Sequence, residues 1–218
     1  MKPILTSLLL LLFSSSLFAT AQYPDKIIYN GKEYSLHSNP MEAYFAEHPD
    51  KRPEDGIRST ACWRGYIATF EIRDKQLFLK DIQCQYSKKG KNNSFETEWK
   101  SVLGEIFPKD SLVKIDWLTG LLVLPYGKMV NYVHMGYAST YENYFLLEID
   151  KGDFKKEKKL DYKEYEAFRD KQFAAWQKTD EYKKQLEELT KDGSSVEFIN
   201  SFLRDYVIEY TSRILTDD

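Results

Sequence analysis

A change in hydrophobic period near Asp161 constrains the fold of this chain more than any other feature. Before Asp161, short segments of alternating apolar and polar residues are separated by turn residues, which is typical of β-strands. After it, apolar residues recur at helical spacing, first up to Gly193 and then from Ser194 onward. Strands first and helices last predict an α+β fold, with a largely antiparallel β-sheet body followed by a C-terminal helical hairpin.

The length of the chain, 218 residues, suits one domain preceded by a leader. We expect a signal peptide over residues 1–21, a β-rich domain over 22–160 and a helical hairpin over 161–218 that packs on the same domain. The helix-start signals of the hairpin are Asp161 with Glu164 and Ser194 with Glu197. The side chains expected to contact the body are Tyr165, Phe168, Phe202 and Tyr206.

Residues 1–21 have the three parts of a secretory signal peptide. Lys2 supplies the positive start, residues 4–12 are mainly apolar, and Ala19-Thr20-Ala21 places small residues before a cut near Ala21. The apolar run is shorter than the roughly 20 residues that cross a bilayer, and no cysteine directly follows it to receive a lipid. We therefore expect a soluble mature chain, periplasmic or secreted, without a transmembrane segment.

The charge pattern argues against nucleic acid as a partner. The chain carries a formal charge of -3, and loss of Lys2 with the signal peptide would leave -4. Acidic and basic residues are interspersed, so no basic patch is expected to contact phosphates. Tyrosine is abundant instead, and its amphipathic ring suits both sheet surfaces and ligand platforms.

The stretch TACWRGYIATFEIRDKQLFLKDIQCQY, residues 60–86, predicts one long β-hairpin around an Asp74-Lys75 turn. Apolar side chains on both faces predict that this hairpin is central in the sheet. In the simplest register Cys62 and Cys84 lie on opposite faces and three places apart, although a bulge would bring them into register. Because an oxidising compartment would allow these two cysteines to pair, a Cys62–Cys84 disulfide stays an open alternative.

Shorter elements flank this hairpin. KIIYNGKEYSLH predicts a small hairpin around Asn30-Gly31, and NPMEAYFAEHP predicts a helix with Asn39 as N-cap and Glu42 completing the cap. Residues 86–99 are polar enough to predict a loop, and residues 125–127 predict a turn between strands.

The string NPMEAYF…HPDKRP…STACWRGYIATFEI…LFLKDI, with YVHMGY later, resembles a family of bacterial proteins with no established activity. The shared pattern is NP-x-E-x-YF … PDKRP … WRGYxATFEI, it covers residues 25–165, and its most specific part surrounds Trp63-Arg64-Gly65-Tyr66. The resemblance implies a single β-rich bacterial domain and transfers no catalytic residue.

Motifs for catalysis and metal binding are missing from the sequence. It contains no G-x-S-x-G, P-loop, H-E-x-x-H or dinucleotide fingerprint. His37, His48 and His134 are too dispersed for a zinc site. A Ser139–His134 pair is conceivable, but spacing alone says nothing about hydrogen-bond reach. We therefore expect no catalytic residue, no metal and no cofactor.

Arg64 is the most unusual side chain of the central hairpin, because it is charged in an otherwise apolar and aromatic strand. It either forms a structural ion pair or contacts a ligand, and the first is favoured because an uncompensated buried charge costs several kcal/mol. The carboxylates considered as its partner are Asp116, Glu71, Asp81 and Glu142.

Residues 131–145, NYVHMGYASTYENYF, place several polar side chains in one segment bounded by strands. Binding residues often lie in such loops on a rigid sheet. The alternative is that Gly136 forms a bulge and the tyrosines only cover a sheet end. With Arg64 and Asp116 added, the candidate ligand-binding residues are Arg64, Asp116, His134, Tyr137, Tyr141 and Glu142.

Three functional hypotheses follow. The first is an exported binding or interaction module without catalysis, whose partner is a small molecule, a glycan or a protein. The second is a small envelope- or carbohydrate-directed hydrolase that uses carboxylates such as Asp116 and Glu142, which would have to face each other across a cleft. The third is an immunity- or inhibitor-like protein.

Overall fold

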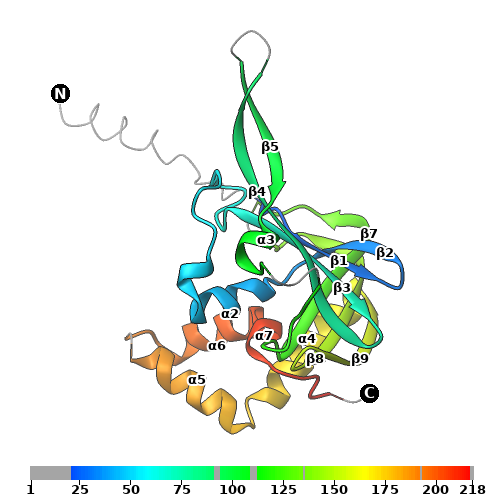
Figure 1. The fold of residues 1–218 in the computed structure, drawn as a ribbon. Helices are drawn as coiled ribbons and strands as arrows, with labels where there is room; N and C mark the ends of the chain where they lie inside the picture. Colours follow the sequence, from blue (N-terminus) through cyan, green and yellow to red (C-terminus); the bar gives the residue numbers. More distant parts are fainter. Residues whose placement is uncertain (1–20, 91–93, 109–111, 135, 192, 217–218) are drawn as a thin grey trace, which may run out of the picture.

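The computed structural model describes residues 21–90, 94–108, 112–134, 136–191 and 193–216 (Figure 1). It contains a mixed, mostly antiparallel sheet of nine strands followed by C-terminal helices, so the predicted α+β fold is confirmed. The predicted signal peptide lies outside the described residues except for Ala21.

The strands of the sheet are neighbours in the order β2-β1-β3-β4-β9-β8-β7, and β5 and β6 pair with β4 away from this path. The pair β1–β3 is parallel, and the other pairs of named strands are antiparallel. Their bounds are β1 Asp25–Tyr29, β2 Lys32–Leu36, β3 Tyr66–Arg73, β4 Gln76–Lys89, β5 Phe95–Ser101, β6 Val113–Lys114, β7 Gly120–Asn131, β8 Thr140–Asp150 and β9 Asp153–Asp161.

The central hairpin β3–β4 turns at Asp74-Lys75 as predicted, and both turn residues have positive φ. From Arg73 opposite Gln76 to Phe70 opposite Leu79, the strand pairs follow the register expected for a two-residue turn. Lys80 is then an extra residue in β4, and pairing resumes one place later. This bulge places Cys84 opposite Tyr66 and on the buried face of the sheet.

The sheet curls, so that its outer strands β2 and β7 approach each other. The backbone N–H of His37, just after β2, donates to the carbonyl of Val123 in β7 at 2.9 Å. The inner face holds the first hydrophobic core, which helices α2 (Pro40–Glu47) and α3 (Leu103–Ile106) complete. A single 3-10 turn, Pro49–Lys51, follows α2.

The C-terminal helices cover the outer face of β7 and β8 and form a second core with them (Figure 1). Each arm of the predicted hairpin is divided in two, because the chain turns at residues 177–179 and again at Tyr206. No helix in the described part of the chain is long and apolar enough to cross a membrane. The four helices are α4 Tyr162–Trp176, α5 Asp180–Thr190, α6 Val196–Asp205 and α7 Val207–Tyr210.

The contacts predicted between helices and body are present in part. Phe168 is buried in the second core, and the ring of Tyr165 stacks on Tyr144 of β8 at 4.2 Å. Phe202 is partly buried and packs mainly against helix residues, whereas Tyr206 is 41% exposed. Tyr206 therefore has surface left over for contacts outside the core.

The three predicted helix caps differ in outcome. The predicted start at Ser194 with Glu197 is wrong by one residue, because Ser195 is the N-cap of α6 and its Oγ accepts the backbone N–H of Phe198 at 3.2 Å. Asp161 and Glu164 form a complete capping box at the start of α4, as predicted. Asn39 precedes α2 but makes no side-chain cap, because its Oδ1 accepts from the hydroxyl of Tyr137 at 3.0 Å. The predicted cap at Asn39 is therefore wrong, and its side chain is free for a long-range contact.

Two segments predicted as irregular are strands. Within residues 86–99, predicted as a loop, the described part is mostly strand, because β4 extends to Lys89 and pairs with β5 in an arm that projects from the body (Figure 1). The predicted turn at residues 125–127 is a bulge within β7, where Gly127 has a φ of 84°. Glu142 stabilises this bulge by accepting the backbone N–H of Lys128 at 2.7 Å.

Candidate functional site

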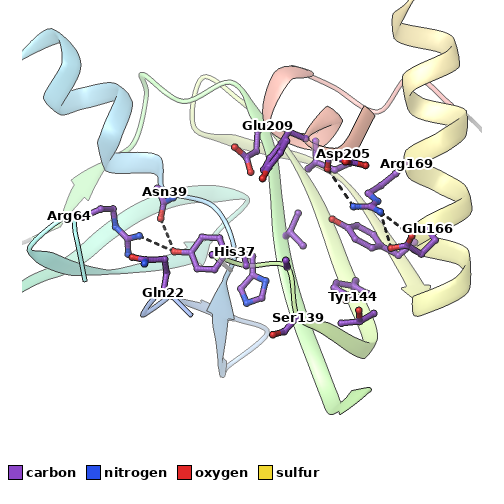
Figure 2. Close-up of a pocket in the computed structure, with 18 of the residues that line it drawn as sticks. Gln22, His37, Asn39, Arg64, Ser139, Tyr144, Glu166, Arg169, Asp205 and Glu209 are labelled. Carbon is purple, nitrogen blue, oxygen red and sulfur yellow. Dashed lines mark hydrogen bonds and ion pairs between the residues drawn. The ribbon is translucent and has the colours of Figure 1, made fainter. Parts of the chain in front are cut away.

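A cleft of about 510 Å³ lies between the body and the C-terminal helices. Figure 2 shows Arg64 and Asn39 on one side of it and Glu209, Asp205 and Arg169 on the other. A second cavity of about 430 Å³ shares part of this lining, so the two form one elongated cleft. The shared lining residues are His37, Asn39, Trp63, Ile208 and Glu209.

The two sides of the cleft come from different parts of the fold. The body wall comes from the β2–α2 connection, the turn before β3 and the segment after Gly136: His37, Asn39, Trp63, Arg64 and Tyr137. The helix wall comes from α4, the end of α6 and α7: Glu166, Arg169, Asp205, Tyr206 and Glu209.

Arg64 organises the body wall. Its side chain is 1% exposed and its Nη2 lies 3.3 Å from Oδ1 of Asp25, which is fully buried. Nη2 also donates to the carbonyl of Tyr23 at 2.9 Å, and Nη1 donates to the hydroxyl of Tyr137 at 3.0 Å. Because this hydroxyl in turn donates to Asn39, one chain of hydrogen bonds joins Asp25, Arg64, Tyr137 and Asn39.

Asp25 is the ion-pair partner of Arg64, so none of the four predicted carboxylates, Asp116, Glu71, Asp81 and Glu142, has that role. The parallel pairing of β1 with β3 brings Asp25 there, and no local pattern announces that pairing. Oδ1 of Asp25 also accepts the backbone N–H of Ala68 at 2.9 Å. Burial raises the pKa of Asp25 to about 7, and the charge of Arg64 opposes that rise.

The structure therefore supports the structural ion pair, while Arg64 still lines the cleft. The pair is not fully satisfied, since Nε of Arg64 and Oδ2 of Asp25 have no hydrogen-bond partner among the described residues. A buried pair of this kind is costly to break from one side.

His37 covers the outer end of this hydrogen-bond chain. Its ring stacks on Tyr137 with centroids 4.6 Å apart, and Tyr141 meets it edge-on at 5.6 Å. Burial lowers the pKa of His37 to about 4 and raises the pKa of Tyr137 to about 12. Both rings are therefore neutral near pH 7, and Arg64 and Asp25 are the groups of the body wall that can carry charge there.

The helix wall carries charge at its surface. Nη2 of Arg169 contacts both carboxylate oxygens of Glu166 at 3.0 Å, and Nη1 donates to the carbonyl of Asp205 at 3.4 Å. The carboxylates of Asp205 and Glu209 have no hydrogen bond or ion pair with any residue that the structure describes. Partial enclosure by protein raises the pKa of Glu209.

Two exposed aromatic side chains face the cleft from opposite walls. Trp63 of the body wall is 52% exposed and Tyr206 of the helix wall is 41% exposed. The sequence pattern assigned Trp63 to the hairpin and Tyr206 to the packing stripe, so both were missed as site residues. The signal that could have identified Trp63 was its place before Gly65, whose φ of 81° belongs to a turn rather than a strand.

Of the predicted ligand-binding residues, Arg64 and Tyr137 line the cleft, and Tyr141 lies behind His37. His134 is exposed and contacts Tyr132, with Nδ1 3.3 Å from the hydroxyl, and it does not line the cleft. The structure thus brings together one half of the predicted set.

Asp116 and Glu142 lie at opposite ends of β8. Asp116 is exposed and lies beside Gly152, which belongs to the turn between β8 and β9. Glu142 lies near the start of β8. Eight strand residues at about 3.3 Å each separate these ends by roughly 26 Å. These two carboxylates therefore do not form the pair that the predicted hydrolase required.

Ser139 forms hydrogen bonds with the backbone, and the two cysteines are buried. Oγ of Ser139 accepts the N–H of Val133 at 3.0 Å and donates to its carbonyl at 3.3 Å, so its hydroxyl is engaged with the backbone of Val133. Cys62 and Cys84 are free buried thiols, so the structure contains no Cys62–Cys84 disulfide. Burial raises the pKa of both thiols. Within the described ranges no group of three or more metal-ligating side chains is present.

Comparisons with known proteins do not indicate a function for this chain. No family model, curated protein or solved structure matches the chain. The resemblance to the bacterial family carrying the WRGYxATFEI pattern therefore stays a prediction, and the cleft between body and helices is the basis for any statement about function.

Proposed function

We propose that the protein is an exported binding module whose cleft receives a small molecule or a short glycan. The observation that carries this proposal is the pair of exposed aromatic side chains, Trp63 and Tyr206, on opposite walls of a cleft of about 510 Å³. Cavities of roughly 300–1,000 Å³ with aromatic walls and a few polar groups are typical ligand sites.

The body wall supports this proposal because it is already ordered. The Arg64 hydrogen bonds fix Tyr137, and the stacked ring of His37 fixes Tyr137 from the other side. A wall held in this way loses little conformational entropy when a ligand binds. Export, inferred from residues 1–21, would place the cleft in the periplasm or outside the cell.

A hydrolase is the second candidate, with carboxylates other than the predicted ones. Glu166, Asp205 and Glu209 all belong to the helix wall, and a raised pKa like that of Glu209 is a property of general acids. We rank this candidate second because Glu166 is neutralised by Arg169. The immunity- or inhibitor-like hypothesis has no observation in its favour beyond the export signal.

A thermal-shift screen of the purified protein tests the proposal. The compounds are envelope sugars, small amines and small anions, and the variants are Trp63→Ala and, as a control, Phe95→Ala. Phe95 is an exposed aromatic residue on the β4–β5 arm, outside the cleft. At least one compound should raise the melting temperature of the wild type and of Phe95→Ala but not of Trp63→Ala.

The proposal is wrong if no compound stabilises the wild type, or if Trp63→Ala responds as the wild type does. Chromatography of each stabilising glycan after incubation then separates the two candidates. An unchanged glycan agrees with a binding module, whereas a shortened one favours the hydrolase.

A further inference from the structure

The charges that line the cleft are not balanced. The guanidinium of Arg64 is paired with Asp25, and that of Arg169 is paired with Glu166. The carboxylates of Asp205 and Glu209 have no such partner in the part of the chain that the structure describes. The charge left for a ligand is therefore negative, and it is confined to the helix wall.

Glu209 belongs to the lining shared by the two cavities. So does Trp63, whose indole is the most exposed aromatic side chain of the lining. Tyr206, between Asp205 and Glu209 in the sequence, adds a second ring on the same wall. A carboxylate and exposed aromatic rings that line the same cleft are the combination that recognises organic cations, through ion pairing and through attraction to the ring faces.

We infer that the cleft binds an organic ammonium ligand, whose charged nitrogen pairs with Glu209 while its ring or apolar face lies against Trp63. This inference rests on the proposed binding function and adds the chemical class of the ligand. A protonated amino sugar and a quaternary amine are simple examples of that class.

Other ligand classes fit these contacts less well. An anion would face Asp205 and Glu209, while the two arginines of the lining are engaged with other carboxylates. A neutral ligand would displace water from Glu209 and leave a desolvated charge without a partner, which is costly. A cation compensates that charge, and the raised pKa of Glu209 agrees with a carboxylate whose surroundings already disfavour the ionised form.

Matched ligands isolate the contribution of the ligand charge. Titration calorimetry compares glucosamine with N-acetylglucosamine, and choline with its neutral isostere 3,3-dimethylbutan-1-ol, at a pH where amines and carboxylates are ionised. At least one cation should bind about tenfold or more tightly than its neutral counterpart, a difference within the range of cation–aromatic and ion-pair contacts.

Matched variants isolate the contribution of the protein. Glu209→Gln keeps the shape of the side chain and should weaken the cation about tenfold without lowering the melting temperature. The control Glu187→Gln removes an exposed carboxylate of α5 that lines neither cavity, and it should bind as the wild type does. Trp63→Ala should lose binding, and Trp63→Phe should recover part of it.

Three results would overturn the inference: neither cation binds, the neutral counterparts bind equally well, or Glu209→Gln keeps full affinity for the cation. These three results would leave the proposed binding function itself standing. A neutral or anionic compound whose stabilising effect depends on Trp63 would show that the cleft binds ligands of another class, whereas no Trp63-dependent compound at all would refute binding itself.

Discussion

The two walls of the cleft are built on opposite principles. In the body wall the charges of Arg64 and Asp25 are buried, paired with each other and connected to neutral aromatic residues. In the helix wall the carboxylates of Asp205 and Glu209 lie at the surface of two short helices without a partner among the described residues. Under the proposed function the two walls have different roles, the body wall stabilising the fold and the helix wall selecting the ligand.

Removing Arg64 is the strongest way to break this comparison. Arg64→Ala leaves Asp25 buried without its cation and should lower the free energy of unfolding by roughly 3 to 5 kcal/mol, measured by urea denaturation. The double variant Arg64→Ala/Asp25→Asn should recover part of that loss. As a control, Arg73→Ala removes an exposed arginine paired with Glu71 and should change stability little. Equal effects of Arg64→Ala and Arg73→Ala would contradict a structural role for the body wall.

The partly buried ring of His37 gives the body wall a pH dependence. Its pKa is about 4 in the folded chain and 6.5 in the unfolded one, so the unfolded state binds more protons between these values. The contribution of neutral His37 to the free energy of unfolding is complete above pH 6.5. It should be lost as pH falls through about 4, by up to about 3 kcal/mol. Asp25 has the opposite dependence, because its pKa is raised to about 7 and its contribution is lost as pH rises through that value.

The variant His37→Phe separates these two opposing effects. It keeps the ring stacked on Tyr137 but removes the titration, so wild type and variant should diverge as pH falls from 6.5 to 4 in denaturation experiments. His48→Phe, at an exposed position after α2, is the matched control. Parallel pH profiles for wild type and His37→Phe would show that the imidazole is not held neutral.

Glu209→Gln tests the other side of the comparison, with a much smaller expected effect on stability. Because Glu209 has no ion-pair partner in the described structure, the free energy of unfolding should change by less than about 0.5 kcal/mol. A large loss in denaturant unfolding would mean that the helix wall also contributes to stability, and the division of roles would fail.

Thiol chemistry should leave the protein unchanged until it unfolds. Cys62 and Cys84 are buried, and burial raises the pKa of both thiols, so neither should react with an aromatic disulfide reagent in the native state. Both should react in denaturant. Absence of thiols after unfolding would reveal a disulfide, and rapid native reaction would show that this side of the body is open to solvent.

The sequence predicted the local features of the fold and few of its long-range pairings. Alternating periods identified most strands, and the capping box at Asp161 marked the start of α4, because both patterns depend on near neighbours. The bulge at Lys80 and the parallel pairing that brings Asp25 to Arg64 depend on distant segments, which no local period records.

The candidate site was predicted less well, for a related reason. Arg64 and Tyr137 were identified because a charge in an apolar strand and a polar loop are both unusual. Trp63 and Tyr206 have side chains that suit a core as well as a binding surface, so their type could not distinguish the two. Glu209 looked like the polar face of an amphipathic helix until the fold placed it in a cleft.

The hydrogen-bond chain of the body wall also has a consequence for folding kinetics. Arg64 is hydrogen-bonded to Tyr23, which is 41 positions away in the sequence, and to Tyr137, which is 73 positions away. Tyr137 is hydrogen-bonded to Asn39, which is 98 positions away. Contacts of such separation form only after long loops close, and that closure is slow and entropically costly. We therefore expect the wall to be completed late in folding, so that ligand binding would report that its distant segments have reached their native arrangement.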